Sequence, residues 1–398
     1  MKYKSRSEHA LGKLSGRALT DLFRQALTLL PMVVLFYWSK DIVYFQISIL
    51  TSATTLASAV FSLGLNISSL MPKNRILVRE IQKFNLFTLP FAFFSAVLLL
   101  VLLGKVNFLG EASVLIFLLG EIIYTLCISL IARHSINASD SYLSALANFL
   151  SPLFRSASFC LLLTVETRNI AVVFHCLSQI SILVLGLYKI KPFQRHKPNQ
   201  ASFRSLFQES KQIWWSSLLV TAIDNLTIFV LAISLEVHTA SLMMVSLRVF
   251  GVVGMPIQSL AAARLSGWVK SGKEELLLAI RVGALAALFG FVSLLTLDLL
   301  INKRLTELSW LAAGLAPIAP FRSMSTFLGN FLLTNGFANL RTRVLAIVSV
   351  LLITFFGTQQ HFPLIGKTPA VYSIAIVAGE AFVFIGLYWL TSKKAEII

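Results

Sequence analysis

The sequence predicts an all-α polytopic membrane protein, with about twelve transmembrane helices in two six-helix lobes around a central cavity. Hydrophobic residues make up 57% of the 398 residues and charged residues only 13%, and the mean hydropathy is +0.80. Too few polar residues remain to cover the surface of a soluble protein of this size. The apolar residues also lie in consecutive segments that can cross a bilayer, which takes about 20 residues of helix.

Twelve spans follow from these apolar segments. In the first half they are 17–38, 43–71, 86–104, 112–133, 142–165 and 170–190, and in the second half 213–235, 238–264, 276–300, 308–334, 342–357 and 369–391. Six spans on each side of a polar stretch indicate a parallel repeat of two membrane-embedded lobes. We therefore expect an N-terminal lobe over 1–190, a basic cytoplasmic connector over 191–212 and a C-terminal lobe over 213–398.

The lysines and arginines set the predicted topology. With a cytoplasmic N-terminus, 24 of the 34 fall in cytoplasmic segments and 6 in external ones, which is the bias expected of cytoplasmic loops. Both termini are then cytoplasmic. Because the basic residues lie in short loops between apolar segments, the net charge of +17 indicates membrane orientation and not nucleic-acid binding.

Catalytic and metal-binding motifs are missing from the sequence. The three cysteines, Cys127, Cys160 and Cys176, lie inside apolar segments at irregular spacing, which excludes a disulfide framework or a zinc site of the CxxC type. No Gly-rich phosphate-binding loop occurs either. We therefore expect no enzyme activity, no catalytic residues, no metal and no resident cofactor.

Polar side chains inside the predicted spans are the candidate functional residues, because such groups are costly in lipid and face a partner or a hydrated cavity. The candidate ligand-binding residues are Arg24, Asn66, Asn148, Arg155, Arg248 and Arg322, and the candidate ion-coupling acids are Asp21, Glu121, Asp224 and Glu380. Polar helix faces from both halves that meet at mid-depth predict a central hydrated cavity. Arginine stays charged and binds phosphate through two hydrogen bonds. An arginine-lined cavity therefore favours an anion, and the carboxylates are available for coupling to a proton or sodium gradient.

The same residues also have a purely structural interpretation. Asp21 and Arg24 are i, i+3 neighbours that can neutralise each other. The other pairs open to this interpretation are Arg248 with Asp224 and Arg322 with Glu380. Serine and threonine likewise pack membrane helices together without any further role. Three arginines at mid-depth on three separate helices favour the cavity over this alternative.

Three parts of the sequence carry a family resemblance: the first predicted span with Arg24, the run VYFQISILTSATTLASAVFSLGLNISSLMPKNR at 43–75, and the run from WWSSLLVTAIDN to AAARLSGW at 214–268. They resemble the Wzx-type O-antigen flippases of the multidrug/oligosaccharidyl-lipid/polysaccharide (MOP) exporter superfamily. The resemblance implies alternating access, a cationic V-shaped cavity and an undecaprenyl-pyrophosphate-linked oligosaccharide as cargo. It also implies the bacterial inner membrane as location, membrane lipid as surroundings, and a polysaccharide polymerase and a chain-length regulator as partners.

Two other functions stay open from the sequence. A multidrug or other small-molecule antiporter of the same fold would have a cavity that is more acidic and apolar, to suit cationic drugs. A membrane enzyme of polysaccharide assembly would need a sizeable external loop or a catalytic motif. The longest predicted external connection, 358–369, has about twelve residues, which disfavours the enzyme.

We expect the basic stretch around the connector to set the topology of the second half. Its cations are Lys189, Lys191, Arg195, Lys197, Arg204 and Lys211. Changing all six to Glu should misplace the spans that follow, because positive charge marks cytoplasmic segments. Labelling of single cysteines from the periplasm would measure this. A charge-reversed protein that keeps its topology and loses only its activity would assign the stretch another role.

Overall fold

The computed structural model describes residues 23–395 with gaps. The positions left out inside this interval are 24–25, 40, 63–77, 105–109, 139, 191–202, 265–267, 303–306, 335–336 and 362–367. All regular structure in the described part is helical. When each broken helix is counted once, the described residues form twelve helices, one for each predicted span.

The helices of the first half come before residue 191. They are an apolar helix Ala26–Trp38, α2 Asp41–Phe61, α4 Val78–Leu103, α5 Glu111–Ala138, α6 Ser141–Ala145, the π-helix η2 Leu146–Leu150, α7 Ser151–Leu161 and α8 Arg168–Ile190. The helices of the second half are α9 Phe203–Ser234, α10 Val237–Arg264, α11 Trp268–Asn302, α12 Glu307–Leu315, α13 Ile318–Thr334, α14 Ala338–His361 and α15 Pro369–Ala395.

Within the described ranges, α2, α4, α8, α9, α14 and α15 each contain a stretch of 19 to 24 residues that is apolar enough to cross a bilayer. The chain is therefore a multi-pass membrane protein.

Two predicted spans are broken, and a proline stands at each break. In the span predicted at 308–334, α12 ends at Leu315 and α13 begins at Ile318, on either side of Pro317. In the span predicted at 142–165, the chain widens into η2 immediately before α7, whose second residue is Pro152. Proline has no N–H to donate and its ring clashes with the preceding turn, so it ends or distorts a helix.

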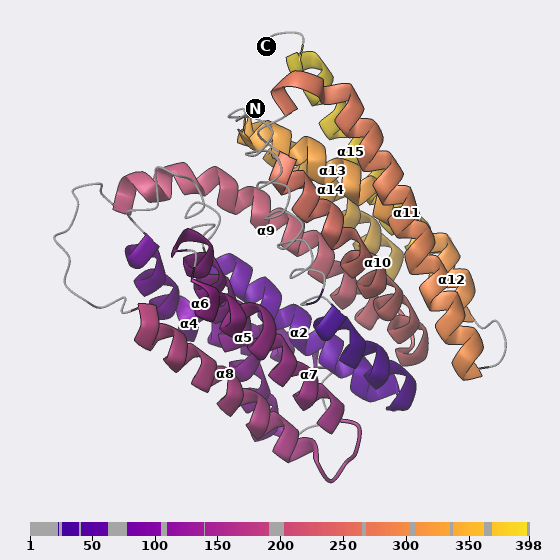
Figure 1. Cartoon of the computed structure of the whole chain (residues 1–398). Helices are drawn as coiled ribbons and strands as arrows, with labels where there is room; N and C mark the ends of the chain where they lie inside the picture. Colours follow the sequence, from indigo (N-terminus) through magenta and orange to yellow (C-terminus); the bar gives the residue numbers. More distant parts are fainter. Residues whose placement is uncertain are drawn as a thin grey trace, which may run out of the picture. The chain divides into compact units, whose positions relative to one another are not determined.

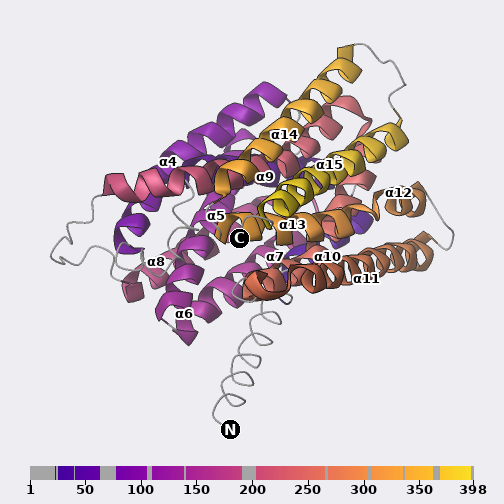
Figure 2. The ribbon, with the colours of Figure 1, turned by 90° about the horizontal axis from the view of Figure 1, so that it is seen from above.

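The described residues separate into two compact units, Leu30–Ile233 and a second that contains Ser234–Ile398. We call them the N-terminal and the C-terminal unit. The lobe boundary expected at 191–212 stays a prediction, since 191–202 lies outside the described residues. In the N-terminal unit α5 packs against α2, α4 and α8, and α7 packs against α8 (Figure 1). In the C-terminal unit α13 packs against α10, α11, α14 and α15 (Figure 2).

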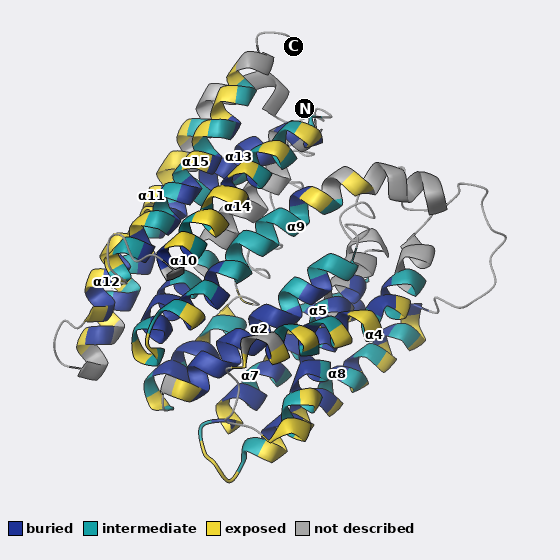
Figure 3. Cartoon of the chain, turned by 180° about the vertical axis from the view of Figure 1, so that it is seen from behind, coloured by how far each residue is buried: buried dark blue, intermediate teal, exposed yellow. Residues whose placement is uncertain are grey.

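Burial differs sharply between two neighbouring helices of the N-terminal unit. Helix α2 is buried along most of its length, as Figure 3 shows in dark blue. Helix α4 presents large apolar side chains at helical spacing: Phe87, Phe91, Phe94, Leu98 and Val101 are all exposed. A continuous apolar stripe on one helix face fits contact with lipid chains. We therefore place α4 at the lipid-facing side of its unit and α2 in its interior.

Glycines bring α5 and α8 close together. A Cβ on Gly120 of α5 would lie 2.6 Å from Cδ2 of His175 and 3.2 Å from the backbone Cα of Cys176, both on α8. A Cβ on Gly186 of α8 would lie 2.5 Å from Cδ1 of Ile131 on α5. Small residues at membrane-helix contacts let the backbones approach in this way. The distance between α5 and α8 therefore depends on both glycines.

The exchange Gly186→Ala tests this packing. The added methyl group has no room beside the fully buried Ile131, so we expect a loss of about 1–3 kcal/mol, as overpacked cores show. The matched control is Gly357→Ala on α14, where an added Cβ meets nothing within 4 Å. Thermal unfolding of the purified protein in detergent would compare the two. Ile131→Val, which removes the nearest atom, should restore part of the loss, and equal unfolding temperatures for both glycine variants would contradict the close approach.

Candidate functional site

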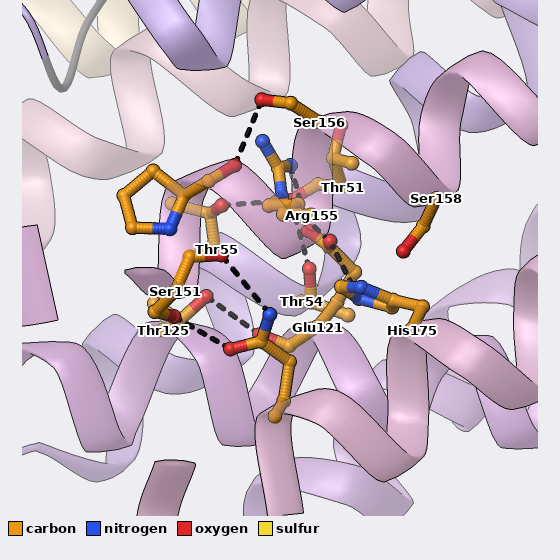
Figure 4. Close-up of polar contacts among 12 residues, drawn as sticks. Thr51, Thr54, Thr55, Glu121, Thr125, Ser151, Arg155, Ser156, Ser158 and His175 are labelled. Carbon is orange, nitrogen blue, oxygen red and sulfur yellow. Dashed lines mark hydrogen bonds and ion pairs between the residues drawn. The ribbon is translucent and has the colours of Figure 1, made fainter. Parts of the chain in front are cut away.

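Glu121 on α5 and Arg155 on α7 form a bidentate ion pair inside the N-terminal unit (Figure 4). Nε of Arg155 donates to Oε1 of Glu121 at 2.7 Å, and its Nη2 donates to Oε2 at 2.8 Å. Glu121 is 2% exposed and Arg155 5% exposed. Two parallel charge-assisted hydrogen bonds are the geometry that best offsets the cost of taking both charges out of water.

Aromatic rings enclose the guanidinium group. Its central carbon lies 4.7 Å from the ring centroid of Tyr124 and 4.5 Å from that of Phe159. The negative faces of the rings attract a cation, and more strongly when water is excluded. Arg155 is thus held by Glu121 along its edge and by rings of α5 and α7 on its faces.

His175 of α8 is the third ionisable residue at this point, and we call Glu121, Arg155 and His175 the buried cluster. Its Nε2 lies 3.0 Å from Oε1 of Glu121, and the side chain is fully buried. The ring centroids of Phe117 and Phe159 lie 5.3 Å and 6.1 Å from that of the imidazole, and Gly120 provides the space for the ring against α5. Three ionisable side chains from three helices therefore meet at one point.

Hydrogen bonds join α7 to α8 one helical turn along α8 from His175. The hydroxyl of Ser151 donates to Oε1 of Gln179 at 2.6 Å, and Nε2 of Gln179 donates to the backbone carbonyl of Ser151 at 3.2 Å. Ser151 is the first residue of α7 and precedes Pro152. Gln179 follows His175 by four residues, so both lie on the same face of α8. This face of α8 anchors α7.

Helix α2 brings a polar face to the interior of the same unit. Its buried polar residues are Gln46, Ser48, Thr51, Ser52, Thr54 and Ser58. The hydroxyl of Thr51 donates to the carbonyl of Ser48 at 3.1 Å and that of Thr54 to the carbonyl of Thr51 at 2.9 Å. Figure 4 draws Thr51, Thr54 and Thr55 in the region of the cluster, and α2 packs against α5. Hydroxyls that bond back to their own helix can be buried at little cost.

The C-terminal unit contains a second ion pair, between Arg322 of α13 and Glu380 of α15. Nε of Arg322 donates to Oε1 of Glu380 at 2.5 Å, with side chains that are 24% and 10% exposed. A Cβ on Gly251 of α10 would lie 3.9 Å from Nη1 of Arg322, so the guanidinium also approaches α10. This pair is more open than the pair of Glu121 and Arg155.

The structure brings together some of the residues predicted from the sequence. Glu121 meets Arg155, and the alternative pairing of Arg322 with Glu380 is present. Asn148 lies in η2, where its Nδ2 donates to the hydroxyl of Ser144 at 3.2 Å.

Five other predicted residues are not assigned to a site. Asp21, Arg24 and Asn66 lie outside the described residues. Arg248 and Asp224, the other pair of the structural interpretation, are both partly buried and belong to different units.

His175 and Gln179 were missed from the sequence. The signal was present, because a histidine in the middle of a predicted span is an intramembrane ionisable residue and therefore a candidate in its own right. Among the described residues, no group of three or more His, Cys, Asp or Glu could hold a metal ion.

The fold is similar to that of several solved membrane transporters. No protein-family model and no curated relative matches the chain. An inward-facing multidrug resistance MATE family transporter of the MOP superfamily is similar with a TM-score of 0.66 and 14% identity, over 94% of this chain and 98% of that one.

Two more solved structures extend the comparison. The MATE multidrug transporter DinF-BH in complex with R6G has a TM-score of 0.66 and 12% identity, over 96% of this chain and 95% of that one. The lipid II flippase MurJ in an inward closed conformation has a TM-score of 0.59 and 13% identity, over 94% and 87%. At this level of identity the likeness establishes the fold, which is found both in multidrug transporters and in a lipid flippase.

Removing one partner of the buried pair should destabilise the protein strongly. Glu121→Gln leaves the Arg155 charge enclosed without a counter-ion, and such a change costs about 3–5 kcal/mol. Glu380→Gln is the matched control, since its partner Arg322 is 24% exposed and therefore less enclosed by protein than Arg155. The double variant Glu121→Gln/Arg155→Met should recover much of the loss. Unfolding temperatures in detergent would measure this, and an equal effect of both single variants would contradict the difference in burial.

Proposed function

We propose that the chain is a flippase that moves an undecaprenyl-pyrophosphate-linked oligosaccharide, an O-antigen or related repeat unit, across the bacterial inner membrane. Its N- and C-termini would both lie in the cytoplasm. The fold shared with a lipid II flippase and with MATE transporters supports transport by alternating access in preference to an enzyme. In this proposal a polysaccharide polymerase and a chain-length regulator act on the product after translocation.

One observation favours an anionic cargo. In both ion pairs the arginine is the more exposed partner, and the difference is clear for Arg322 at 24% against Glu380 at 10%. A ligand that approaches this pair therefore reaches the guanidinium before the carboxylate. Guanidinium groups bind phosphate through two hydrogen bonds and remain charged in apolar surroundings. The pyrophosphate of a lipid-linked saccharide has the matching charge and geometry.

The carboxylates supply the coupling step in this proposal. When a phosphate takes the guanidinium of Arg322 or Arg155, the acid that was paired with it loses its counter-ion. A carboxylate in that position binds a proton or a sodium ion more readily. Glu121, Asp224, Glu380 and Asp21 are the proposed ion-coupling residues, and Arg24, Arg248, Asn66 and Asn148 complete the proposed cargo contacts.

A small-molecule antiporter is the second candidate, because MATE multidrug transporters share the fold over nearly the whole chain. The two functions predict opposite roles for the members of the exposed pair. An antiporter for cationic drugs depends on the carboxylate of Glu380 to bind its substrate. A flippase for a phosphorylated lipid depends on the guanidinium of Arg322.

Complementation separates the two functions. A strain that lacks its own O-antigen flippase should regain surface polysaccharide with this chain if the cargo has a compatible sugar unit. Arg322→Gln should then reduce the polysaccharide at least tenfold, whereas Arg322→Lys keeps the charge and loses only the two-pronged geometry, so it should retain part of the activity. Arg248→Ala should also abolish it. Immunoblots of membranes provide the control for abundance.

Two outcomes would count against the flippase. Full polysaccharide with Arg322→Gln at normal abundance would contradict the flippase mechanism. Resistance of a pump-deficient strain to cationic dyes, lost with Glu380→Gln and retained with Arg322→Gln, would favour the antiporter.

A further inference from the structure

One carboxylate oxygen in the N-terminal unit faces two basic side chains. Oε1 of Glu121 lies 2.7 Å from Nε of Arg155 and 3.0 Å from Nε2 of His175. Arg155 also reaches Oε2, so it holds the carboxylate more completely in this conformation. Within the described ranges, neither ring nitrogen of His175 makes a hydrogen bond of regular geometry; Nε2 has the 3.0 Å contact with Glu121, and Nδ1 has no partner. A neutral imidazole that directs its Nε2 hydrogen to Glu121 therefore presents Nδ1 as a basic nitrogen.

We propose that His175 is the proton-loading residue of the N-terminal unit and that, once protonated, it replaces Arg155 as the counter-ion of Glu121. Arg155 is then released to bind an anionic phosphate of the cargo. Proton and phosphate therefore load together. The inference rests on the proposed function, because a phosphate-bearing cargo supplies the anion.

Charge balance in the buried cluster explains the coupling. With a neutral histidine, Glu121 and Arg155 cancel, and the cluster carries no net charge. A proton on His175 alone leaves one uncompensated positive charge in an interior where such charges are costly. A phosphate on Arg155 alone leaves an uncompensated negative charge at Glu121. A proton on His175 and one phosphate charge at Arg155 cancel, so each favours the other.

His175 and Arg155, the two side chains that compete for Glu121, lie on helices that differ in how firmly they are held. His175 and Glu121 lie on α8 and α5, which Gly120 and Gly186 hold in close contact. Their separation is therefore set by the packing of the two helices. Arg155 lies on α7, which follows the π-helix η2 and carries Pro152 at its start. Irregular turns of this kind are the places where membrane helices bend. Arg155 is therefore the partner that can leave, and His175 the one that stays.

Few other groups in the described residues compete for the proton. Helix α8 packs against α5, α7 and η2. Besides Glu121, α5 brings the phenol of Tyr124 to the face of Arg155, and η2 has no titratable residue. On α7 and α8 the remaining groups are the thiols of Cys160, which is exposed, and Cys176, which is buried. Arg168 lies at the first residue of α8, and Tyr188 and Lys189 lie in its last turn, away from the middle of the helix where His175 lies. The hydroxyl-bearing face of α2 is uncharged. Because His175 is fully buried, the proton reaches it only when the unit opens.

Proton uptake on binding a defined probe tests the inference. The probe is farnesyl-diphospho-N-acetylglucosamine, whose pyrophosphate diester stays fully ionised between pH 6 and 8, added to the purified full-length chain in detergent. Histidine is the side chain that changes charge in this range. We expect the Kd of the wild type to rise by about tenfold or more from pH 6 to pH 8, and close to one proton to be taken up per probe at the upper end.

The matched variants are His175→Gln and His238→Gln, the latter an exposed histidine at the start of α10. His238→Gln should keep the pH dependence, and His175→Gln should bind with a Kd that does not vary with pH. Arg155→Gln should lose both affinity and proton uptake. Infrared difference spectra of the wild type with isotope-labelled histidine should show a new imidazolium when the probe binds. This measurement holds even if His175→Gln does not fold.

The outcomes separate the two proposals. Binding with a pH-independent Kd, without proton uptake or an imidazolium signal, overturns the assignment of His175 and leaves the flippase proposal intact. A Kd that still depends on pH in His175→Gln also overturns the assignment of His175 and leaves the flippase proposal intact. No binding of the probe at any pH overturns both.

Discussion

The structure of the N-terminal unit depends on the cost of a charge that water cannot reach. Arg155 lies almost wholly inside the unit, and an ion in that position is stable only with a paired counter-charge. Glu121 supplies the counter-charge from α5, and the rings of Tyr124 and Phe159 cover the remaining faces. Helices α5 and α7 therefore keep one relative arrangement for as long as this pair is formed, because a shift of either helix would separate the charges.

The two ion pairs have similar chemistry and differ in burial. The pair of Glu121 and Arg155 is closed and shares an oxygen with a histidine, which suits a site that responds to protons. The pair of Arg322 and Glu380 has a guanidinium that remains partly exposed. Such a pair loses less when an incoming anion takes the arginine. The partly exposed pair is therefore the easier of the two for a ligand to reach.

The sequence was sufficient for the helices and insufficient for the site. Each predicted span has a helix, because apolar segments of spanning length are a strong signal in the sequence. The pairing of Arg322 with Glu380 could be named as an alternative, since few acids lie in the neighbouring spans. The partnership of Glu121, Arg155 and His175 could not, because it depends on which faces of α5, α7 and α8 meet. That rotation is set by Gly120 and by the π-helix η2, and a regular 100° periodicity through 142–165 does not reproduce it.

The π-helix also bears on how relatives of this chain should be aligned. The five residues of η2 form a wide turn. A regular α-helix has about 3.6 residues per turn, so the wide turn contains one residue more than an ordinary one. Removing one residue there converts the wide turn into an ordinary one and leaves α6 and α7 in nearly the same orientation. Removing one residue elsewhere in a span turns everything beyond it by about 100°. A single-residue gap within a spanning helix therefore belongs at 146–150, and such a gap placed in α5 or α8 would mark an alignment error.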